Sequence, residues 1–231
     1  MKNHIRTIAF DADDTLWVNE PYYRETEAAF ASLLAGYLPE KEISNVLFEV
    51  EMQNMPLYGY GAKAFMLSLV ETALKISNNS LPATVIDQII RLGKKQIERP
   101  IKLLDDVPDI LSKLHGRYRL VMATKGDLLD QERKLKNSNL TDFFHHIEVM
   151  SDKKEANYVK LIAHLDLEPE QFLMIGNSMR SDVLPVLKLG SYAIHVPYHM
   201  TWQHERIGDE NIEHERFIRV NRLKEICKFL K

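Results

Sequence analysis

Two aspartates stand two positions apart at the end of a short apolar run, and this feature constrains the fold of the chain most strongly. The run Ile8–Phe10 leads directly into Asp11-Ala12-Asp13-Asp14-Thr15. Such a run is typical of a buried strand, and in open parallel sheets functional groups gather at the carboxyl ends of strands. We therefore expect Asp11 and Asp13 to act at one site. The alternative is a turn and helix-cap cluster, which Asp and Thr also favour.

Three further apolar runs also end in polar residues. The run 121–123 is followed by Thr124, the run ending at Met150 by a segment that contains Lys153, and the run 172–175 by a segment that contains Asp182. Each run has the length and composition of a buried strand. Four predicted strand ends thus each offer polar groups to a common site.

The spacing of apolar residues divides the chain into two kinds of region. Between about residues 21 and 99 the helical spacing i, i+3, i+4 recurs and predicts four helices, separated at Leu38-Pro39, Met55-Pro56 and 77–82. From residue 100 onward helices and strands alternate, which predicts a parallel sheet covered on both faces. We expect an α/β, doubly wound core from residues 1–18 and 100–231, with a small all-helical domain inserted at 19–99.

Composition limits the partners and the compartment of the protein. The 231 residues carry 30 basic and 33 acidic side chains, a net charge of −3, which offers no basic field for nucleic acid and favours a small ligand. No run of 18 apolar residues exists, and no apolar secretory segment precedes the first strand, so we expect no membrane contact. Cys227 is the single cysteine; it excludes an intrachain disulfide and favours a reducing, cytoplasmic location, with a core role for its side chain.

In order and spacing, the four polar strand ends resemble the four motifs of the haloacid dehalogenase superfamily, whose members are mostly phosphatases. The resemblance covers nearly the whole chain. It implies a Rossmann-like core with a helical cap domain inserted after the first motif. Dehalogenases of this superfamily lack the aspartate two residues after the nucleophile, so Asp13 favours phosphate esters as substrates.

Within this resemblance, Asp11 is best placed as the nucleophile that forms an aspartyl phosphate, and Asp13 as the acid and base. Asp14 is expected to be a solvated or capping carboxylate. The resemblance also implies a Mg²⁺ ion, held by the Asp11 carboxylate, the Asp13 backbone carbonyl and Asp182. Motif four departs from the commonest pattern, because Asn177 stands where an acid is usual. An asparagine amide oxygen can still hold a metal-bound water.

Thr124 and Lys153 are the expected phosphate-binding side chains. Thr124 would donate a hydrogen bond to a phosphate oxygen, or act only as a turn hydroxyl. Lys153 has a rival in Lys154 and is preferred because its distance to Tyr158 matches superfamily members with Ser-Asp-Lys at this point. Near Asp182, Ser178 and Ser181 are expected to cap the helix that follows.

The inserted helices are expected to choose the substrate, as the cap does in similar proteins. The segment 57–63, Leu-Tyr-Gly-Tyr-Gly-Ala-Lys, predicts a tight turn in which Tyr60 or Lys63 contacts substrate, with a plain helix start as the alternative. The histidine-rich segment 195–204 is more suited to a wall of the site, through His199 or Trp202, than to a metal centre.

The sequence predicts a magnesium-dependent phosphatase of a small phosphorylated metabolite. A resemblance of Asp-Asp-Thr to bacterial nucleotidases hints at a nucleoside monophosphate, and a sugar phosphate is the other candidate. A phosphosugar mutase of the same superfamily and a non-catalytic protein that binds phosphorylated metabolites are the alternatives.

Overall fold

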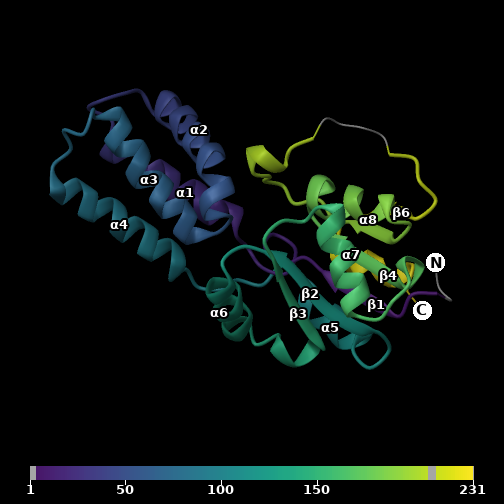
Figure 1. Cartoon of the computed structure of the whole chain (residues 1–231). Helices are drawn as coiled ribbons and strands as arrows, with labels where there is room; N and C mark the ends of the chain where they lie inside the picture. Colours follow the sequence, from purple (N-terminus) through teal and green to yellow (C-terminus); the bar gives the residue numbers. More distant parts are fainter. Residues whose placement is uncertain (1–3, 208–211, 231) are drawn as a thin grey trace. The chain divides into compact units, whose positions relative to one another are not determined.

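The computed structural model describes residues 4–207 and 212–230, and the chain divides into two compact units (Figure 1). The α/β unit contains the described residues of Met1–Glu20, Ile101–Lys125 and Lys134–Lys231, and the helical unit contains Pro21–Pro100 and Gly126–Arg133. The sequence places the boundaries after residues 18 and 99, close to these positions. It does not predict that 126–133 belongs with the helices.

The α/β unit is built on a six-stranded parallel sheet with the strand order β3-β2-β1-β4-β5-β6. The predicted doubly wound α/β fold is therefore confirmed. The last strand, which is short and half-buried, has no clear sequence signal and was not expected. The strands are β1 (Thr7–Phe10), β2 (Arg119–Lys125), β3 (His146–Met150), β4 (Phe172–Gly176), β5 (Tyr192–His195) and β6 (Phe217–Arg219).

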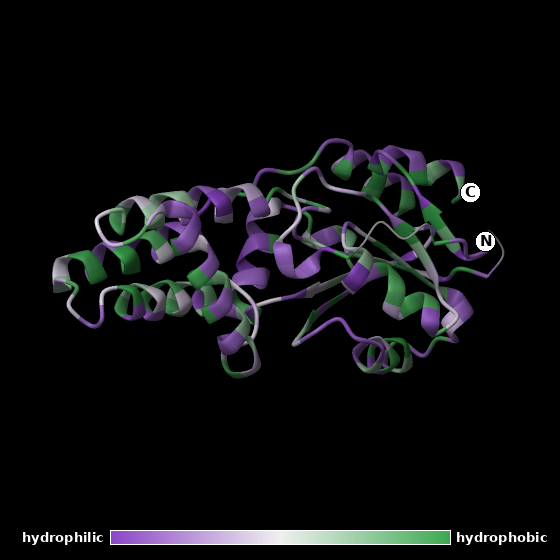
Figure 2. Cartoon of the chain, turned by 90° about the horizontal axis from the view of Figure 1, so that it is seen from above, coloured by the Kyte–Doolittle hydropathy of each residue, from purple (hydrophilic) through white to green (hydrophobic). Residues whose placement is uncertain are grey.

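Alternate residues of the strands enter two separate hydrophobic clusters, one on each face of the sheet. Ile8 and Phe10 of β1 pack in one cluster with α5 (Val107–Leu114), while Ala9 packs in the other with α7 (Glu155–His164) and α8 (Leu184–Lys188). Figure 2 shows hydrophilic and hydrophobic residues alternating along the helices. Burial on both faces explains why β4 and most of β1 are continuously apolar, whereas the half-buried β3 and β6 also carry charged residues.

Four helices form the helical unit, as the periodicity predicts: α1 (Glu20–Leu33, whose first residue belongs to the α/β unit), α2 (Glu40–Tyr58), α3 (Ala62–Ile76) and α4 (Ala83–Ile97). Their core is made of large apolar side chains, among them Phe30, Ile43, Phe65 and Ile89. Phe30 and Leu33 have helical spacing within α1. Leu34 and Tyr37 continue that spacing beyond the end of the helix, where Leu34 is buried and Tyr37 is 43% exposed.

The predicted break at Met55-Pro56 is wrong. Pro56 lies inside α2, and the chain leaves the helix at Gly59, which has φ 71°. A proline near the end of a helix removes one backbone hydrogen bond, and the apolar face of α2 outweighs that loss. Gly59 and Gly61 (φ 111°) supply the positive φ values that the turn to α3 requires.

The remaining helical pieces are short. Helix α6 (Leu128–Ser138) begins in the helical unit and ends in the α/β unit, and a π-helix (Met179–Val183) follows β4. Near the C-terminus a 3-10 helix spans Leu223–Lys228, and Cys227 on it packs against the core, as expected for its side chain. No helix among the described residues combines the length and the apolar character needed to cross a membrane.

Candidate active site

The carboxylates after β1 are placed by a strand that continues one residue further and then turns tightly. The Asp11 N–H donates to the Ile175 carbonyl of β4 (2.9 Å), and the Leu16 N–H donates back to the Ala12 carbonyl (2.8 Å). Asp14 sits in this turn with φ 61°. The turn follows the carboxyl end of β1 directly, so Asp11 and Asp13 lie at the edge of the sheet where the sequence predicts the site.

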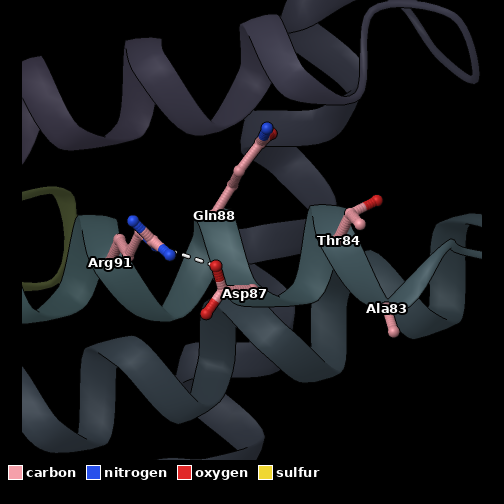
Figure 3. Close-up of a pocket in the computed structure, with 5 residues that line it drawn as sticks. All are labelled: Ala83, Thr84, Asp87, Gln88 and Arg91. Carbon is pink, nitrogen blue, oxygen red and sulfur yellow. Dashed lines mark hydrogen bonds and ion pairs between the residues drawn. The ribbon is translucent and has the colours of Figure 1, made fainter.

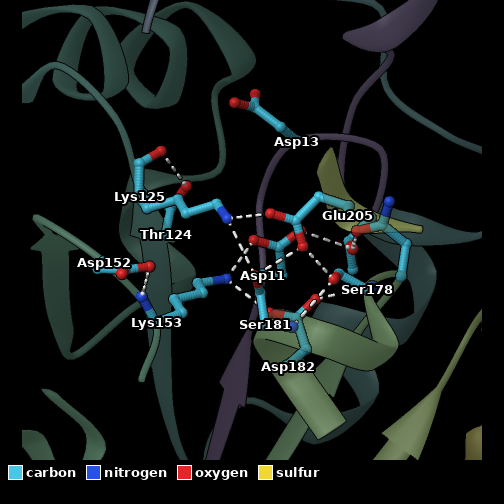
Figure 4. A network of polar contacts seen from close by, with 12 residues as sticks. Asp11, Asp13, Thr124, Lys125, Asp152, Lys153, Ser178, Ser181, Asp182 and Glu205 are labelled. Carbon is cyan, nitrogen blue, oxygen red and sulfur yellow. Dashed lines mark hydrogen bonds and ion pairs between the residues drawn. The ribbon is translucent and has the colours of Figure 1, made fainter. Parts of the chain in front are cut away.

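Asp11 shares a buried lysine with Asp182. The Lys153 ammonium donates to Asp11 Oδ1 at 2.5 Å and to Asp182 Oδ1 at 2.7 Å, and its side chain is only 1% exposed (Figure 4). The rival Lys154 is 74% exposed and pairs with Asp152. Of the two lysines, the structure therefore brings Lys153 to the predicted nucleophile.

The charges of this buried trio do not balance. Burial, together with the nearby Asp182, raises the pKa of Asp11 to about 7 against the opposing effect of Lys153. Burial alone would lower the pKa of Lys153, but the two carboxylates outweigh that effect and hold it above its ordinary value. Two carboxylates and one ammonium leave one excess negative charge in a buried place, which an additional cation would offset.

Asp182 lies so close to the end of β4 that only glycine fits opposite it. A Cβ atom at Gly176 would lie 2.2 Å from Asp182 Oδ2, and that oxygen accepts the Ser178 N–H at 2.9 Å. With Oδ1 accepting from Lys153, each carboxylate oxygen already has a donor. This arrangement suits a side chain that positions Lys153, and the role of Asp182 as a metal ligand stays a prediction.

Asp13 has different neighbours from Asp11. Its Oδ1 accepts from the Trp17 indole N–H at 2.7 Å and from the Lys134 ammonium at 2.9 Å, and 24% of its side chain is exposed. Lys134 also donates to Asn19 Oδ1 at 3.0 Å. Sequence reasoning missed both partners. Trp17 stands four residues from Asp13 and carries a polar N–H, which is a usable signal, whereas Lys134 is 121 residues away and offers none.

The expectation that Asp14 is solvated is wrong, while its capping role is present. The carboxylate is buried and accepts the backbone N–H groups of Asn19 and Glu20 at the start of α1 (2.8 and 2.9 Å). Burial raises its pKa to about 8. Asp14 therefore anchors the chain where it leaves the α/β unit.

Asn177 is linked to the nucleophile through Thr15. The Thr15 hydroxyl lies 3.0 Å from Asp11 Oδ2 and 3.3 Å from Asn177 Oδ1. The Asn177 carbonyl accepts from His195 Nε2 at 2.9 Å, because Arg219 donates to His195 Nδ1 and so fixes the neutral tautomer. His195 is thus a buried positioning residue, and burial lowers its pKa.

Thr124 is buried at the carboxyl end of β2, and its hydroxyl lies 3.5 Å from the Lys125 carbonyl, which is a weak contact. Its predicted contact with phosphate is neither made nor blocked by this geometry. Among the described residues, no set of three His, Cys, Asp or Glu side chains has the arrangement of a metal centre.

A second network, which sequence reasoning missed, joins Lys125 and Glu205. Lys125 donates to Glu205 and to the Ser181 hydroxyl (2.9 Å), and Glu205 Oε2 accepts from the hydroxyls of Ser178 (2.5 Å) and Ser181 (2.7 Å) (Figure 4). Ser178 also accepts the Ser181 N–H, which is the predicted capping role. Burial would raise the pKa of Glu205, but Lys125 and the hydroxyl donors bring it down to about 2.

Tyr60 and Lys63 lie in the helical unit. The Lys63 ammonium pairs with Asp127 Oδ2 at 2.9 Å while half of the side chain is exposed, and the backbone at Gly61 packs against Asp127. Tyr60 is half-buried in the turn between α2 and α3. The predicted contact of these two side chains with substrate stays a prediction.

A depression lies on the exposed surface of α4, and none of the candidate site residues lines it (Figure 3). Arg91 donates to Asp87 there at 2.7 Å. All of its lining side chains are exposed, so it is part of the helix surface. It is lined by Ala83, Thr84, Asp87, Gln88 and Arg91.

Comparison with known proteins identifies the class. Residues 5–190 match the family model described as haloacid dehalogenase-like hydrolase, and the chain belongs to that family of hydrolases. The resemblance based on the four motifs is thereby confirmed. A haloacid dehalogenase-like family hydrolase from Xanthomonas campestris is 38% identical, over 94% of this chain and 87% of that chain, with a TM-score of 0.84.

More distant solved structures share the fold. One is the putative HAD-hydrolase YfnB from Bacillus subtilis, bound to magnesium (18% identity, 98% of this chain and 99% of that chain, TM-score 0.68). Another is 2-haloacid dehalogenase from Pseudomonas syringae pv. Tomato (16% identity, 97% of each chain, TM-score 0.63). The curated proteins contain no match to this chain.

Proposed function

We propose that this hydrolase is a magnesium-dependent phosphatase that acts on a small phosphorylated metabolite. The observation that carries the proposal is Asp13, a second carboxylate two residues after the buried Asp11, oriented by Trp17 and Lys134. A phosphate ester needs a proton for its leaving oxygen, whereas a departing halide needs none. Asp13 therefore favours phosphatase over dehalogenase chemistry, although a solved 2-haloacid dehalogenase shares this fold.

In the first half of the proposed reaction, an Asp11 carboxylate oxygen attacks phosphorus and the bond from phosphorus to the leaving oxygen breaks. Asp13 gives its proton to that oxygen, and the alcohol departs. Lys153, which Asp182 holds beside Asp11, offsets the negative charge that the phosphoryl group brings to the nucleophile. Thr124 donates a hydrogen bond to a phosphoryl oxygen.

In the second half, water attacks the phosphorus of the aspartyl phosphate. Asp13, now a carboxylate, takes a proton from the water, and the bond from phosphorus to Asp11 breaks. Inorganic phosphate and free Asp11 are the products. Lys134 stabilises the carboxylate form of Asp13 and therefore assists this half of the reaction, in which Asp13 acts as the base.

The donor set fits Mg²⁺. Asp11 and Asp182 offer carboxylate oxygens and Asp13 its backbone carbonyl, which are hard ligands of the kind this ion prefers. The amide oxygen of Asn177 is available to hold a metal-bound water. The excess negative charge of the buried trio of Asp11, Asp182 and Lys153 is an independent reason for a cation at this place. When bound, the ion would offset the charge of the phosphate that approaches Asp11.

We further propose that the helical unit selects the substrate through Tyr60 or Lys63, and that the substrate is a nucleoside monophosphate or a sugar phosphate. All the residues that we assign to the chemistry lie in the α/β unit. The single cysteine suits a cytoplasmic enzyme.

The test is a screen of nucleoside monophosphates, sugar phosphates and p-nitrophenyl phosphate, with and without Mg²⁺, scored by released phosphate. We expect release that depends on Mg²⁺ and stops with a chelator. Halide release from 2-haloacids, or hydrolysis that a chelator does not affect, would contradict the proposal. Phosphate retained in an isomerised product would identify a phosphosugar mutase. Binding of a phosphorylated metabolite without turnover would identify a non-catalytic binding protein.

A further inference from the structure

We propose that Glu205 is a positioning residue of the active site, which acts by tying the end of β2 to the π-helix that carries Asp182. The inference rests on the proposed function for its kinetic readout. It also implies that segment 197–207, which follows β5, is a fixed part of the site. Lys125 and Glu205 take part in none of the steps assigned above.

The contacts of Glu205 connect three parts of the chain that are distant in sequence. Its partner Lys125 directly follows the predicted phosphate-binding Thr124, and its other partners, Ser178 and Ser181, belong to the segment that ends in Asp182. Lys125 closes the set by donating to Ser181 at 2.9 Å. Both carboxylate oxygens of Glu205 thus accept hydrogen bonds, and both elements contribute donors.

Burial makes this arrangement unusual for a loop carboxylate. The side chains of Glu205 and Lys125 are only 10% and 16% exposed. A buried carboxylate with one partner removed is strongly destabilised, so the four side chains either keep this arrangement together or lose it together. The pair is neutral as a whole and leaves the charge of the Asp11–Lys153–Asp182 trio unchanged.

The position of the network explains what it can do. Thr124 comes from β2 and Asp182 from the π-helix after β4, and the two must keep a constant separation if Lys153 and Thr124 are to meet one phosphate. The Tyr158 hydroxyl already fixes the Ser181 carbonyl from the other direction (2.9 Å). Glu205 adds the connection to β2, so its loss should lower catalysis without altering substrate selection.

The experiment uses the full chain with the substitution Glu205→Gln, which keeps the shape of the side chain and removes its charge. We expect kcat on both the best metabolite and p-nitrophenyl phosphate to fall about 10- to 100-fold, the usual effect of losing a residue that orients site groups. Hydrogen exchange in segment 197–207 should rise in the same variant, measured without substrate or Mg²⁺. The matched control is Glu213→Gln, an exposed carboxylate in the same part of the chain.

Lys125 supplies the second test. Lys125→Met should lower kcat similarly, Lys125→Arg should retain most of the activity, and the Glu205→Gln/Lys125→Met double variant should be little worse than either single variant. Additive losses in the double variant, equal losses in Glu213→Gln, or a fall in kcat that matches the loss of folded protein would overturn the inference. Unchanged hydrogen exchange in segment 197–207 would also overturn it, even if the wild-type chain hydrolyses no phosphate ester. An inactive wild type with raised exchange in Glu205→Gln would refute the phosphatase proposal and support the positioning role.

Discussion

The charged side chains that we assign to the site differ in burial and in the number of their partners between the two units. In the α/β unit, Asp11, Lys153 and Asp182 are buried and bonded to one another, so that each fixes the position of the next. In the helical unit, Lys63 is half exposed and forms a single ion pair with Asp127. Buried and fully bonded groups suit chemistry that requires fixed distances, whereas exposed and weakly held groups can exchange partners for a ligand. The proposed division between reaction and selection requires a difference of this kind.

The largest effect should come from the nucleophile. Asp11→Asn removes the attacking carboxylate and one partner of Lys153, and we expect kcat to fall at least about 10³-fold on every substrate. Released phosphate measured under saturating substrate and Mg²⁺ checks this. Asp142→Asn, an exposed carboxylate elsewhere in the α/β unit, is the control. Near-normal turnover in Asp11→Asn would contradict the proposal that Asp11 is the nucleophile and that the α/β unit carries out the reaction.

The activity lost when Asp13, the proposed acid, is replaced should depend on the leaving group of the substrate. Asp13→Asn cannot donate a proton, so we expect alkyl phosphates to lose about 10²-fold or more and aryl phosphates, whose leaving oxygens need less help, to lose less. The ratio of kcat/KM for an alkyl and an aryl phosphate is the measurement. Equal losses on both substrates would make Asp13 a residue that only orients its neighbours.

Substitutions in the helical unit should lower activity on the physiological metabolite and leave activity on an aryl phosphate unchanged. Lys63→Ala and Tyr60→Ala should each cost the physiological metabolite about 1–3 kcal/mol of transition-state stabilisation while sparing p-nitrophenyl phosphate, which offers few remote contacts. The measurement is kcat/KM for both substrates. Lys75→Ala is a suitable control because Lys75 is on α3 and is exposed to nearly the same degree as Lys63, at 53% against 51%. A parallel loss on both substrates would place this turn in catalysis or folding.

The smallest effect concerns stability below neutral pH. The folded chain holds the pKa of Glu205 at about 2, below the ordinary value of 4.5, so this carboxylate stabilises the fold above pH 4.5 and loses that contribution as the pH falls toward 2. Between pH 5 and pH 3.5 the free energy of unfolding of the wild type should therefore approach that of Glu205→Gln by about 1 kcal/mol. Urea unfolding of both proteins at the two pH values measures it. A constant difference would show that Lys125 does not stabilise the ionised form.

Local patterns were sufficient to predict the parallel sheet apart from β6, the four inserted helices, and the strand ends followed by Asp11, Thr124, Lys153 and Asp182. Each follows an apolar run, and in a parallel sheet the carboxyl ends of the strands lie at one edge. Lys134 and Glu205 escaped prediction because their partners are 121 and 80 residues away and no spacing rule links them. The extent of α2 was misjudged because Pro56 is a local signal that tertiary packing overrides.

The segment Gly126–Arg133 has a consequence for attempts to exchange substrate preference between relatives. Because Lys63 and Gly61 pack against Asp127, a chimera that transplants only residues 21–100 would place foreign helices against the native segment 126–133 and lose this contact. A graft that also carries residues 126–133 preserves the pairing. The C-terminal junction of segment 126–133 falls inside α6, between Arg133 and Lys134. The donor sequence must therefore continue the same helical register up to Lys134, which contacts Asp13.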